Sequence, residues 1–345
     1  MTESSVNRRI IVSERPRYSV PNTSAFRLTT APKPKPADGE ILIRTTWLGI
    51  EPYLYGRVKP TSSQARPVPL GEVMVGPTLG RVDVSNHPDY KAGDLVQGAW
   101  GWQDYTVSDG SRISRIDTEI PRPSYALGAL GMSGFAAYVA INEYLKVQRG
   151  ETLIFGAALG GLGQMVGQLG RMRGARTIGG VSGSKKQRYG MEVLGFDVCL
   201  DRTADDFKAR CAEEFARRGV DCYVMSGSGG VLPLALPHFN LHARIAACGV
   251  MSFYSTVKLP PGPDQTMVVF NEINVKRLSV HGLVASDWVG TPLHEQFRKE
   301  MKAWILGGQI QVVEHIVDGL ENAPDTLQGV FEGRNFGKAV VRVAD

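Results

Sequence analysis

A glycine-rich segment that follows a short apolar run carries the clearest chemical signal in the sequence. The run at 153–155 leads into the spacing Ala157-x-x-Gly160-x-x-Gly163, and helical periodicity follows. The pyrophosphate of a dinucleotide needs a tight turn, a backbone without a Cβ in its way, and a helix N-terminus that points at the anion. The segment therefore predicts a dinucleotide site, although a glycine-rich turn that binds nothing would show the same spacing. The residues expected to contact the cofactor here are Ala157, Gly160, Gly161, Leu162 and Gly163.

The residues after this segment indicate which dinucleotide is bound. Sites for NAD usually place an Asp or Glu about 20 residues further on, where the carboxylate accepts a hydrogen bond from the ribose 2′-hydroxyl. No Asp or Glu occurs between Thr152 and Met191, and this interval contains six Lys or Arg residues instead. Ser182, Lys186 and their neighbours offer hydroxyl, ammonium and guanidinium groups that suit a 2′-phosphate. We therefore predict NADPH as the cofactor; the alternative is that these basic side chains form a solvated helix face.

The positions of cysteine and histidine do not predict a metal site. The four cysteines are Cys199, Cys211, Cys222 and Cys248, and they contain no Cys-x-x-Cys pair. The only early histidine is His87, which lies in the turn-like sequence Asn-His-Pro-Asp-Tyr. Because a catalytic zinc needs thiolate and imidazole ligands, the proton donors that remain are tyrosines, serines and the ribose hydroxyl of the cofactor. The cysteines are expected to be buried thiols in a reducing compartment.

The residues before about 126 predict a β-rich domain. Short alternating or β-branched runs at 40–48, 79–84 and 102–107 are separated by Gly and Pro residues. Many short strands between turn signals are typical of a barrel or a sandwich.

From about residue 150 the pattern changes to strands that alternate with helices, which predicts a doubly wound parallel sheet. The expected strands are 152–155, 176–181, 197–200, 221–224, 244–250 and 278–280. One expected helix follows the first strand and ends at 173, and two others span 185–194 and 205–218. The tail at 311–343 returns to strand-like patterning around a helix at 323–331. The predicted domains are therefore 1–126, 127–300 and 301–345, the last of them packing back on the first.

Length, composition and charge exclude several classes of protein. The 345 residues are 43% hydrophobic and 21% charged, which rules out a collagen, a coiled coil and a disordered tail. Lys and Arg number 39 against 34 Asp and Glu, and this net charge of +5 is small and lacks the broad basic face of a nucleic-acid-binding protein. No run of about 18 apolar residues is present, and the start lacks the apolar core of a secretory signal. A cytoplasmic protein with a small-molecule substrate is expected.

Short motifs along nearly the whole chain resemble those of one enzyme family. They are Asn7-Arg-Arg9, Glu51-Pro-Tyr53, Gly71-Glu-Val-Met-Val-Gly76, Gly101-Trp-Gln-Asp-Tyr105, Leu130-Gly-Met132, Leu194-Gly-Phe-Asp197, Leu259-Pro-Pro-Gly-Pro263 and Asn335-Phe-Gly-Lys338. With them the chain resembles the zinc-independent medium-chain dehydrogenase/reductase superfamily. Within it, the likeness is to the group of prostaglandin reductases, plant double-bond reductases and bacterial curcumin reductases.

The resemblance implies a fold, a reaction and several site residues. The fold is of the α/β class, a GroES-like β-rich domain joined to a Rossmann domain, and close relatives are commonly homodimers. The reaction is the NADPH-dependent reduction of a carbon–carbon double bond conjugated to a carbonyl, with hydride delivered to the β-carbon without a metal. Tyr254 matches a family tyrosine that lies near the carbonyl oxygen, and Tyr53 matches a second tyrosine of the substrate pocket, so the resemblance implies that both are catalytic. Lys186 and Tyr189 match contacts to the 2′-phosphate. Further cofactor contacts are expected at Ser182, Cys248 and Asn335.

Several positions depart from the usual family pattern. Ser133 and Ala136 replace a Pro and a Thr, and Tyr55 replaces an Arg. The segment around Ser226 lacks the usual Glu and Asn, and Ser255 stands in place of an Asn. These changes alter cofactor-side contacts while the phosphate loop is kept. Two other functions therefore stay open: a specialised biosynthetic enzyme that reduces an imine or a quinone or catalyses a non-redox cyclisation, and a non-enzymatic NADPH sensor.

Overall fold

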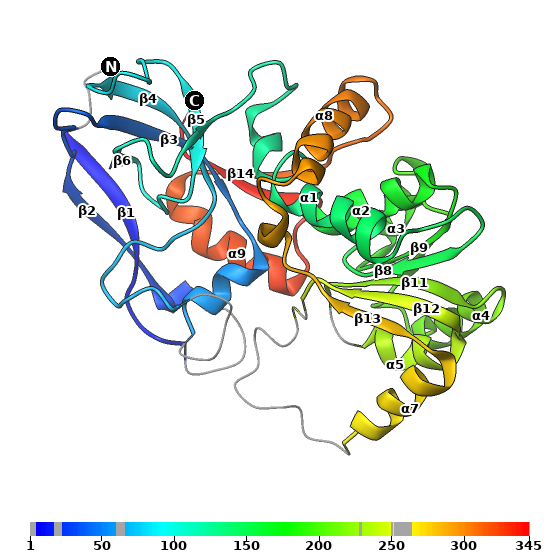
Figure 1. Ribbon diagram of the computed structural model, residues 1–345. Coiled ribbons are helices and arrows are strands. Elements are labelled where there is room, and N and C mark those ends of the chain that lie inside the picture. Colours follow the sequence, from blue (N-terminus) through cyan, green and yellow to red (C-terminus); the bar gives the residue numbers. More distant parts are fainter. Residues whose placement is uncertain are drawn as a thin grey trace. The chain divides into compact units, whose positions relative to one another are not determined.

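The chain folds into two compact units. The computed structural model describes residues 5–16, 23–59, 66–227, 230–249, 251 and 264–344. The first unit contains the described residues up to Leu127 together with those from Glu314 onward, and the second contains those from Gly128 to Val313 (Figure 1). The first unit is therefore assembled from both ends of the chain.

A seven-stranded sheet forms the centre of the first unit, in the order β14-β15-β3-β4-β5-β7, with β6 paired to β3. Its strands are β3 (Ile41–Gly49), β4 (Thr78–Ser85), β5 (Leu95–Gly98), β6 (Tyr105–Ser108), β7 (Ser114–Arg115), β14 (Glu314–Asp318) and β15 (Lys338–Arg342). The pairings are antiparallel except for the parallel pair β14–β15. A separate antiparallel pair consists of β1 (Val6–Val12) and β2 (Phe26–Pro32). This is the GroES-like β-rich domain that the sequence predicts.

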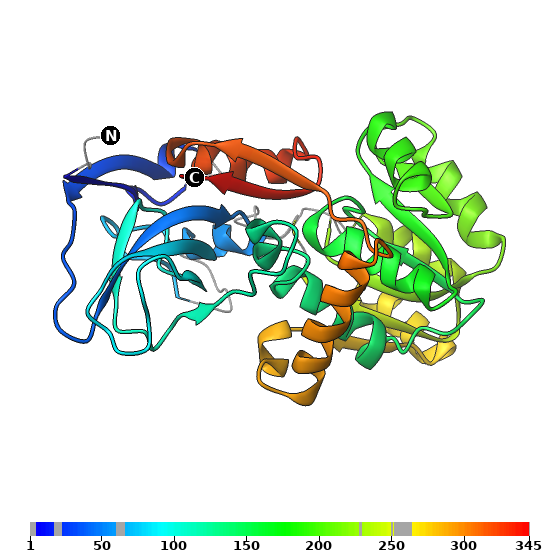
Figure 2. The same cartoon turned by 90° about the horizontal axis from the view of Figure 1, so that it is seen from above.

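An apolar core ties the two ends of the chain together within the first unit. Leu48 of β3 and Val341 of β15 are buried in one cluster with Tyr55. The ring of Tyr55 meets Phe331 of α9 (Ala323–Glu332) edge-on, with centroids 5.5 Å apart. Figure 2 shows the C-terminal segment, in orange and red, lying beside the blue N-terminal strands. The short 3-10 helices of this unit are η1 (Thr23–Ala25), η2 (Pro52–Arg57), η3 (Pro123–Leu127) and η7 (Leu320–Asn322).

The second unit is a parallel six-stranded sheet with helices on both faces. The strand order is β10-β9-β8-β11-β12-β13. The strands are β8 (Thr152–Phe155), β9 (Arg176–Val181), β10 (Val198–Asp201), β11 (Val220–Met225), β12 (Phe239–Ala247) and β13 (Ser279–Gly282). The helices include α1 (Met132–Val139), α2 (Gly161–Met172), α3 (Ser184–Glu192), α4 (Phe207–Ala216), α5 (Val231–Ala235), α7 (Thr266–Lys276) and α8 (Pro292–Leu306). In Figure 1, α2 and α3 lie above the sheet and α5 and α7 below it.

The central strand β8 explains why the sequence pattern identified this sheet so clearly. All four of its residues are buried, because helices cover both faces of a parallel sheet and leave no polar side. Its run of Thr, Leu, Ile and Phe is therefore continuous instead of alternating. The doubly wound fold predicted from the sequence is confirmed, and its strand order is that of a Rossmann domain.

The end of the second unit differs from the sequence-based boundary at residue 301. Helix α8 buries Phe297, Met301 and Ile305. The ring of Phe297 lies 5.1 Å from Phe135 of α1, and the Tyr138 hydroxyl of α1 donates to Glu300 Oε2 at 2.7 Å. This packing keeps the whole of α8 in the second unit, and the first unit resumes at Glu314.

Candidate cofactor and substrate site

The glycine-rich loop between β8 and α2 closes tightly on itself. Ala157 adopts a left-handed backbone with φ of +48°, and its carbonyl accepts a hydrogen bond from the Gly160 N–H at 2.7 Å. A Cβ on Gly163 would collide with the same Ala157 carbonyl oxygen. The turn therefore depends on glycine at 163, as the sequence pattern predicts.

The first turn of α2 presents backbone donors without a side chain in the way. Gly160 is the N-cap and makes no side-chain capping bond, and no acidic residue occupies the first turn. The first N–H groups of a helix lack intrahelical acceptors, and the helix dipole adds partial positive charge there. The first turn of α2 therefore has the free backbone donors that a pyrophosphate needs, and the contacts expected at Gly161, Leu162 and Gly163 stay a prediction.

The strand order places this loop at the point where the sheet topology reverses. Strand β8 lies between β9 and β11, and ligands of open α/β sheets bind outside the carboxyl ends of the strands at such a position. At the end of β11, the Ser226 hydroxyl donates to the Gly156 carbonyl at 3.5 Å. Gly227 Cα lies 3.9 Å from where a Cβ of Gly156 would be. The two strand ends therefore meet through small residues beside the glycine loop.

The carboxyl end of β9 carries the residues predicted for a 2′-phosphate. Lys186 and Tyr189 are three positions apart on α3 and so share one helix face. Burial, and secondly the positive charge of Arg202, lower the pKa of Lys186. Gly183, with φ of +91°, turns the chain between Ser182 and the helix. The structure thus gathers Ser182 and Lys186 around this turn.

Arg202 belongs to this group and was missed by sequence reasoning. Its Nε donates to the Ser182 hydroxyl at 2.6 Å, although the two residues are twenty positions apart. The only signal in the sequence is a basic residue two positions after the predicted strand 197–200. That signal has a meaning only once β10 is known to pair with β9.

Cys248 lies at the carboxyl end of β12, next to the end of β11. Its N–H donates to the Met225 carbonyl at 2.9 Å, and burial raises the pKa of the thiol to about 12. Burial thus favours the neutral thiol of Cys248 over the thiolate. The predicted catalytic Tyr254 lies outside the described residues, as does Ser255.

Tyr53 stands on η2, which follows β3 in the first unit. Its neighbours Leu54 and Tyr55 are fully buried and anchor the turn, whereas Tyr53 keeps 50% of its surface exposed. Desolvation and, secondly, the Glu51 carboxylate raise the pKa of Tyr53, against a smaller opposite effect of Arg57. Since half of the residue is open, this shift reflects crowding around the phenol and not full enclosure. The phenol stays protonated at neutral pH and can donate a hydrogen bond.

A buried ion pair supports the turn that carries Tyr53. Lys338 of β15 is only 3% exposed, and its ammonium donates to the Ile50 carbonyl and to Glu51 Oε1, both at 2.8 Å. The lysine thereby fixes the two residues that join β3 to η2. Sequence reasoning noted both motifs without assigning a role to Glu51 or Lys338.

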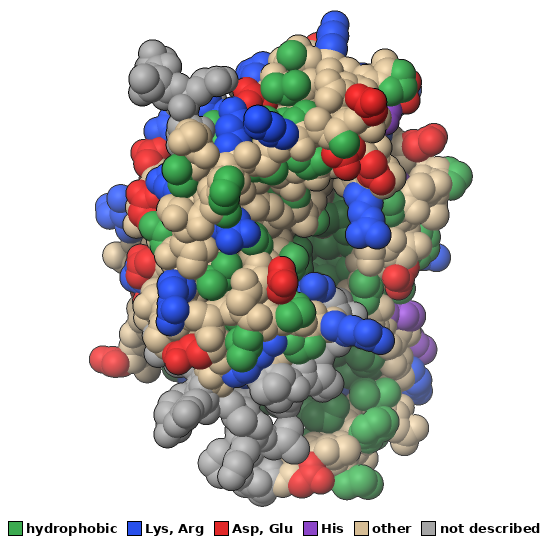
Figure 3. Space-filling model, turned by 90° about the vertical axis from the view of Figure 1, so that its left-hand side faces the viewer, with side chains coloured by type: hydrophobic (Ala, Val, Ile, Leu, Met, Phe, Trp, Pro, Cys, Tyr) green, Lys and Arg blue, Asp and Glu red, His purple; other side chains and the backbone are tan. Residues whose placement is uncertain are grey.

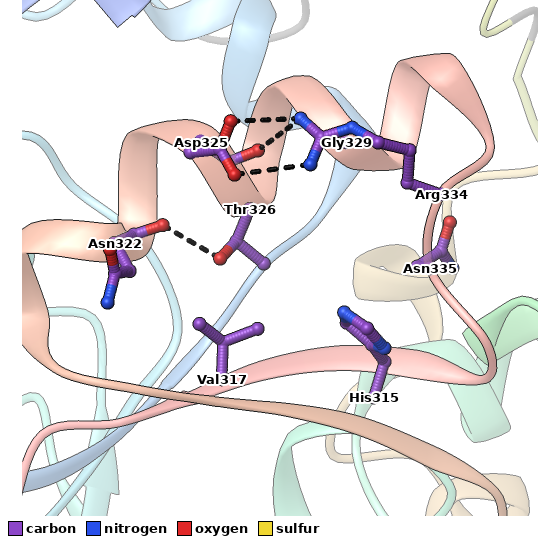
Figure 4. Close-up of a pocket in the computed structure, with 8 residues that line it drawn as sticks. All are labelled: His315, Val317, Asn322, Asp325, Thr326, Gly329, Arg334 and Asn335. Carbon is purple, nitrogen blue, oxygen red and sulfur yellow. Dashed lines mark hydrogen bonds and ion pairs between the residues drawn. The ribbon is translucent and has the colours of Figure 1, made fainter.

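Asn335 lies in the first unit at a cavity of about 250 Å³ between α9 and β14 (Figure 4). Its Nδ2 donates to the Gly337 carbonyl at 2.7 Å. Figure 4 shows the Asp325 carboxylate paired with the Arg334 guanidinium on one side of the cavity and His315 on the strand opposite. The contact between Asn335 and the cofactor stays a prediction.

The described residues contain no group of three His, Cys, Asp or Glu side chains arranged to hold a metal ion. His87 packs edge-on against Tyr90, with ring centroids 5.2 Å apart.

Within the described ranges, no helix is long and apolar enough to cross a membrane. The face shown in Figure 3 mixes Lys and Arg with Asp and Glu side chains, so it carries no broad basic patch.

Comparison with known proteins now identifies the family. Two family models match, one described as the N-terminal domain of oxidoreductase over residues 8–116 and one as zinc-binding dehydrogenase over residues 161–305. The NADPH-dependent curcumin reductase of Escherichia coli K12 is 42% identical over 341 residues, which cover 98% of this chain and 97% of that protein. The chain belongs to the medium-chain dehydrogenase/reductase family.

A prostaglandin reductase and a second bacterial protein, CurA, are also similar to this chain. Prostaglandin reductase 1 of Bos taurus is 32% identical over 93% of this chain and 95% of its own length. The crystal structure of CurA in complex with NADPH from Vibrio vulnificus superposes with a TM-score of 0.93 at 39% identity, covering 98% of this chain and 99% of that one. The predicted family and fold are confirmed, and these relatives agree with the predicted oxidoreductase class and NADPH cofactor.

Proposed function

We propose that this family member is an NADPH-dependent reductase of α,β-unsaturated carbonyl compounds. The observation that carries the proposal is the 42% identity to a curcumin reductase over nearly the full length of both chains. The glycine loop at the topological switch point and the basic group at the end of β9 support NADPH as the cofactor. When bound, NADPH supplies the hydride that the β-carbon of the substrate receives.

The residues proposed to hold the cofactor divide by the part that they would contact. Those for the pyrophosphate are Ala157, Gly160, Gly161, Leu162 and Gly163; those for the 2′-phosphate are Ser182, Lys186 and Tyr189; those near the nicotinamide are Cys248 and Asn335. Backbone N–H groups alone suit the pyrophosphate, whereas the 2′-phosphate, a more highly charged monoester, needs cationic side chains. The neutral Cys248 thiol leaves the nicotinamide side without a competing anion.

Tyr53 and Tyr254 are proposed to stabilise the reacting carbonyl. As hydride reaches the β-carbon, negative charge develops on the carbonyl oxygen, and donors placed there lower the barrier. The raised pKa of Tyr53 keeps its proton available for that hydrogen bond. A proton from solvent then completes the reduction at the α-carbon, so that two electrons and two hydrogens are added in total. No metal takes part in this scheme.

A cytoplasmic homodimer is proposed as the working form. The four cysteines are free thiols, which fits a reducing compartment. All four residues of the edge strand β13 are exposed, and α7 beside it buries none of its residues. An exposed sheet edge next to apolar side chains favours association with a second copy.

The first experiment measures initial rates of NADPH and NADH oxidation against 2-alkenals, enones, curcuminoids and quinones, with EDTA present. The proposal expects turnover of conjugated carbonyls that is faster with NADPH and unaffected by the chelator. NADPH deuterated at C4 should leave deuterium on the β-carbon of the product. Product without deuterium would instead indicate a non-redox reaction, and tight NADPH binding without turnover of any compound would indicate a sensor.

A further inference from the structure

Arg202 is brought to the predicted phosphate site by backbone pairing. Strand β10 runs parallel to β9, with Asp201 opposite Val181. One residue beyond this register, the Arg202 N–H donates to the Val181 carbonyl at 3.0 Å. The backbone position of Arg202 is therefore fixed beside Ser182, at the same edge of the sheet as the glycine loop.

The side chain of Arg202 is held by one hydrogen bond to its Nε. Its Nε donates to the Ser182 hydroxyl at 2.6 Å. Among the residues that the structure describes, its two terminal amino groups have no hydrogen-bond partner, and Arg202 forms no ion pair. A guanidinium held by Nε alone presents two parallel N–H groups, which match two oxygens of a phosphate.

The charges around Arg202 favour an anion. Arg202 lies close enough to Lys186 to lower the pKa of that lysine, so two like charges share the end of β9. The carboxylate of the adjacent Asp201 interacts electrostatically with Arg202 but forms no ion pair with it. Its Oδ1 accepts hydrogen bonds from the Gly183 N–H at 2.7 Å and from the Thr203 N–H and hydroxyl at 3.0 and 2.7 Å. Repulsion between the two cations is relieved when a phosphate lies between them.

We propose that Arg202 determines the preference for NADPH over NADH, by binding the 2′-phosphate with its terminal amino groups while Ser182 holds its Nε. The inference rests on the proposed function, since it assigns a further residue to the same cofactor site. Ser182 acts in it as a positioning residue for the guanidinium as well as a neighbour of the phosphate.

The test compares Arg202→Ala, Arg202→Lys and the control Arg218→Ala by titrating each with NADPH, NADH and 2′,5′-ADP. Arg218 is an exposed arginine two residues before β11, at the amino end of this strand, whereas the site lies at the carboxyl ends of the strands. Loss of a charge-assisted contact to phosphate predicts that Arg202→Ala raises the Kd for NADPH and for 2′,5′-ADP by about tenfold. The Kd for NADH should not change, Arg202→Lys should lie between, and Arg218→Ala should match the wild type.

Separate outcomes overturn the inference and the function on which it rests. A wild-type protein that binds NADPH no better than NADH would contradict the proposed cofactor. A wild type that prefers NADPH, combined with an Arg202→Ala variant that keeps the full preference, would overturn only the role of Arg202. Equal weakening of NADPH and NADH would also overturn it, because that result indicates a general disturbance of the fold.

Discussion

The proposed role of Lys186 as a ligand of the 2′-phosphate predicts that cofactor binding depends on pH. Its pKa lies below the ordinary lysine value of 10.5 because of burial and the nearby Arg202. A lowered pKa means that the ammonium loses its proton at a lower pH than a free lysine does. The charge that attracts a 2′-phosphate is therefore present at neutral pH and is lost as the pH rises.

We expect the Kd for NADPH to increase between neutral pH and the ordinary lysine range, while the Kd for NADH stays constant. The variant Lys186→Arg should remove most of this dependence, since a guanidinium keeps its proton throughout. Fluorescence titration of both nucleotides across the pH range tests the expectation. Parallel curves for NADPH and NADH would speak against Lys186 as a phosphate ligand.

Tyr53 offers a second test on the scale of a single side chain. Replacing it by Phe removes one hydrogen-bond donor and keeps the ring, so kcat should fall by about a hundredfold if the phenol stabilises the developing charge. The Kd for NADPH should stay the same. Tyr90→Phe is the matched control, because it keeps the ring that packs against His87 and removes only a hydroxyl that donates to the Gly110 and Ile113 carbonyls. Unchanged kcat in Tyr53→Phe would remove Tyr53 from the proposed mechanism.

At the scale of elements, the turn between β8 and α2 depends on the absence of a Cβ at Gly163. Gly163→Ala places a methyl group against the Ala157 carbonyl, so the loop must shift and the donors of α2 move with it. NADPH binding should weaken by more than about tenfold, because both the turn and the helix N-terminus position the same phosphate. Gly230→Ala, where a Cβ meets no atom within 4 Å, should bind normally in the same titration.

The pair Lys338–Glu51 provides an energetic test of how β15 supports the turn after β3. Lys338→Met leaves the carboxylate of Glu51 with its buried partner missing, which should destabilise the first unit by about 3 kcal/mol. Arg342→Met on the same strand breaks an ion pair that is open to solvent and should cost less than about 1 kcal/mol. Urea unfolding followed by tryptophan fluorescence compares them. A second variant, Glu51→Gln with Lys338→Met, should recover part of the loss.

Sequence reasoning predicted elements well where a pattern is local. The apolar run of β8, the glycine spacing and the helix after it are consecutive, so periodicity and turn chemistry define them directly. The positions that depend on strand order were not accessible in this way. Arg202 beside Ser182 requires the pairing of β10 with β9, and the Lys338–Glu51 contact joins residues nearly three hundred positions apart. Helix α8 shows the same limit, because only its partner α1 decides to which unit it belongs.

At the scale of the whole molecule, β13 and α7 bear on the proposed homodimer. Met267 and Phe270 of α7 are 77% and 63% exposed, next to a strand with an open edge. Size-exclusion chromatography with light scattering should give twice the chain mass of 37.5 kDa. Phe270→Glu combined with Val280→Lys should give the mass of one chain, whereas Leu306→Lys on α8 should not. A wild type that elutes as one chain would contradict the dimer.

The assembly of the first unit from both chain ends sets the order in which the protein is completed during synthesis. Leu48 and Gly49 of β3 pair with Val341 and Val340 of β15, which are synthesised nearly three hundred residues later. The described residues of the second unit all lie between Gly128 and Val313 and are synthesised before β15. The first unit is therefore completed after the second. Until then the end of β3 from Trp47 to Gly49 lacks its strand partner on the edge where β6 pairs with Ile41–Arg44. A stop codon before residue 338 would remove β15, the strand that joins β14 to β3 in this sheet. Such a truncation should damage the first unit more than the loss of an unpaired tail would.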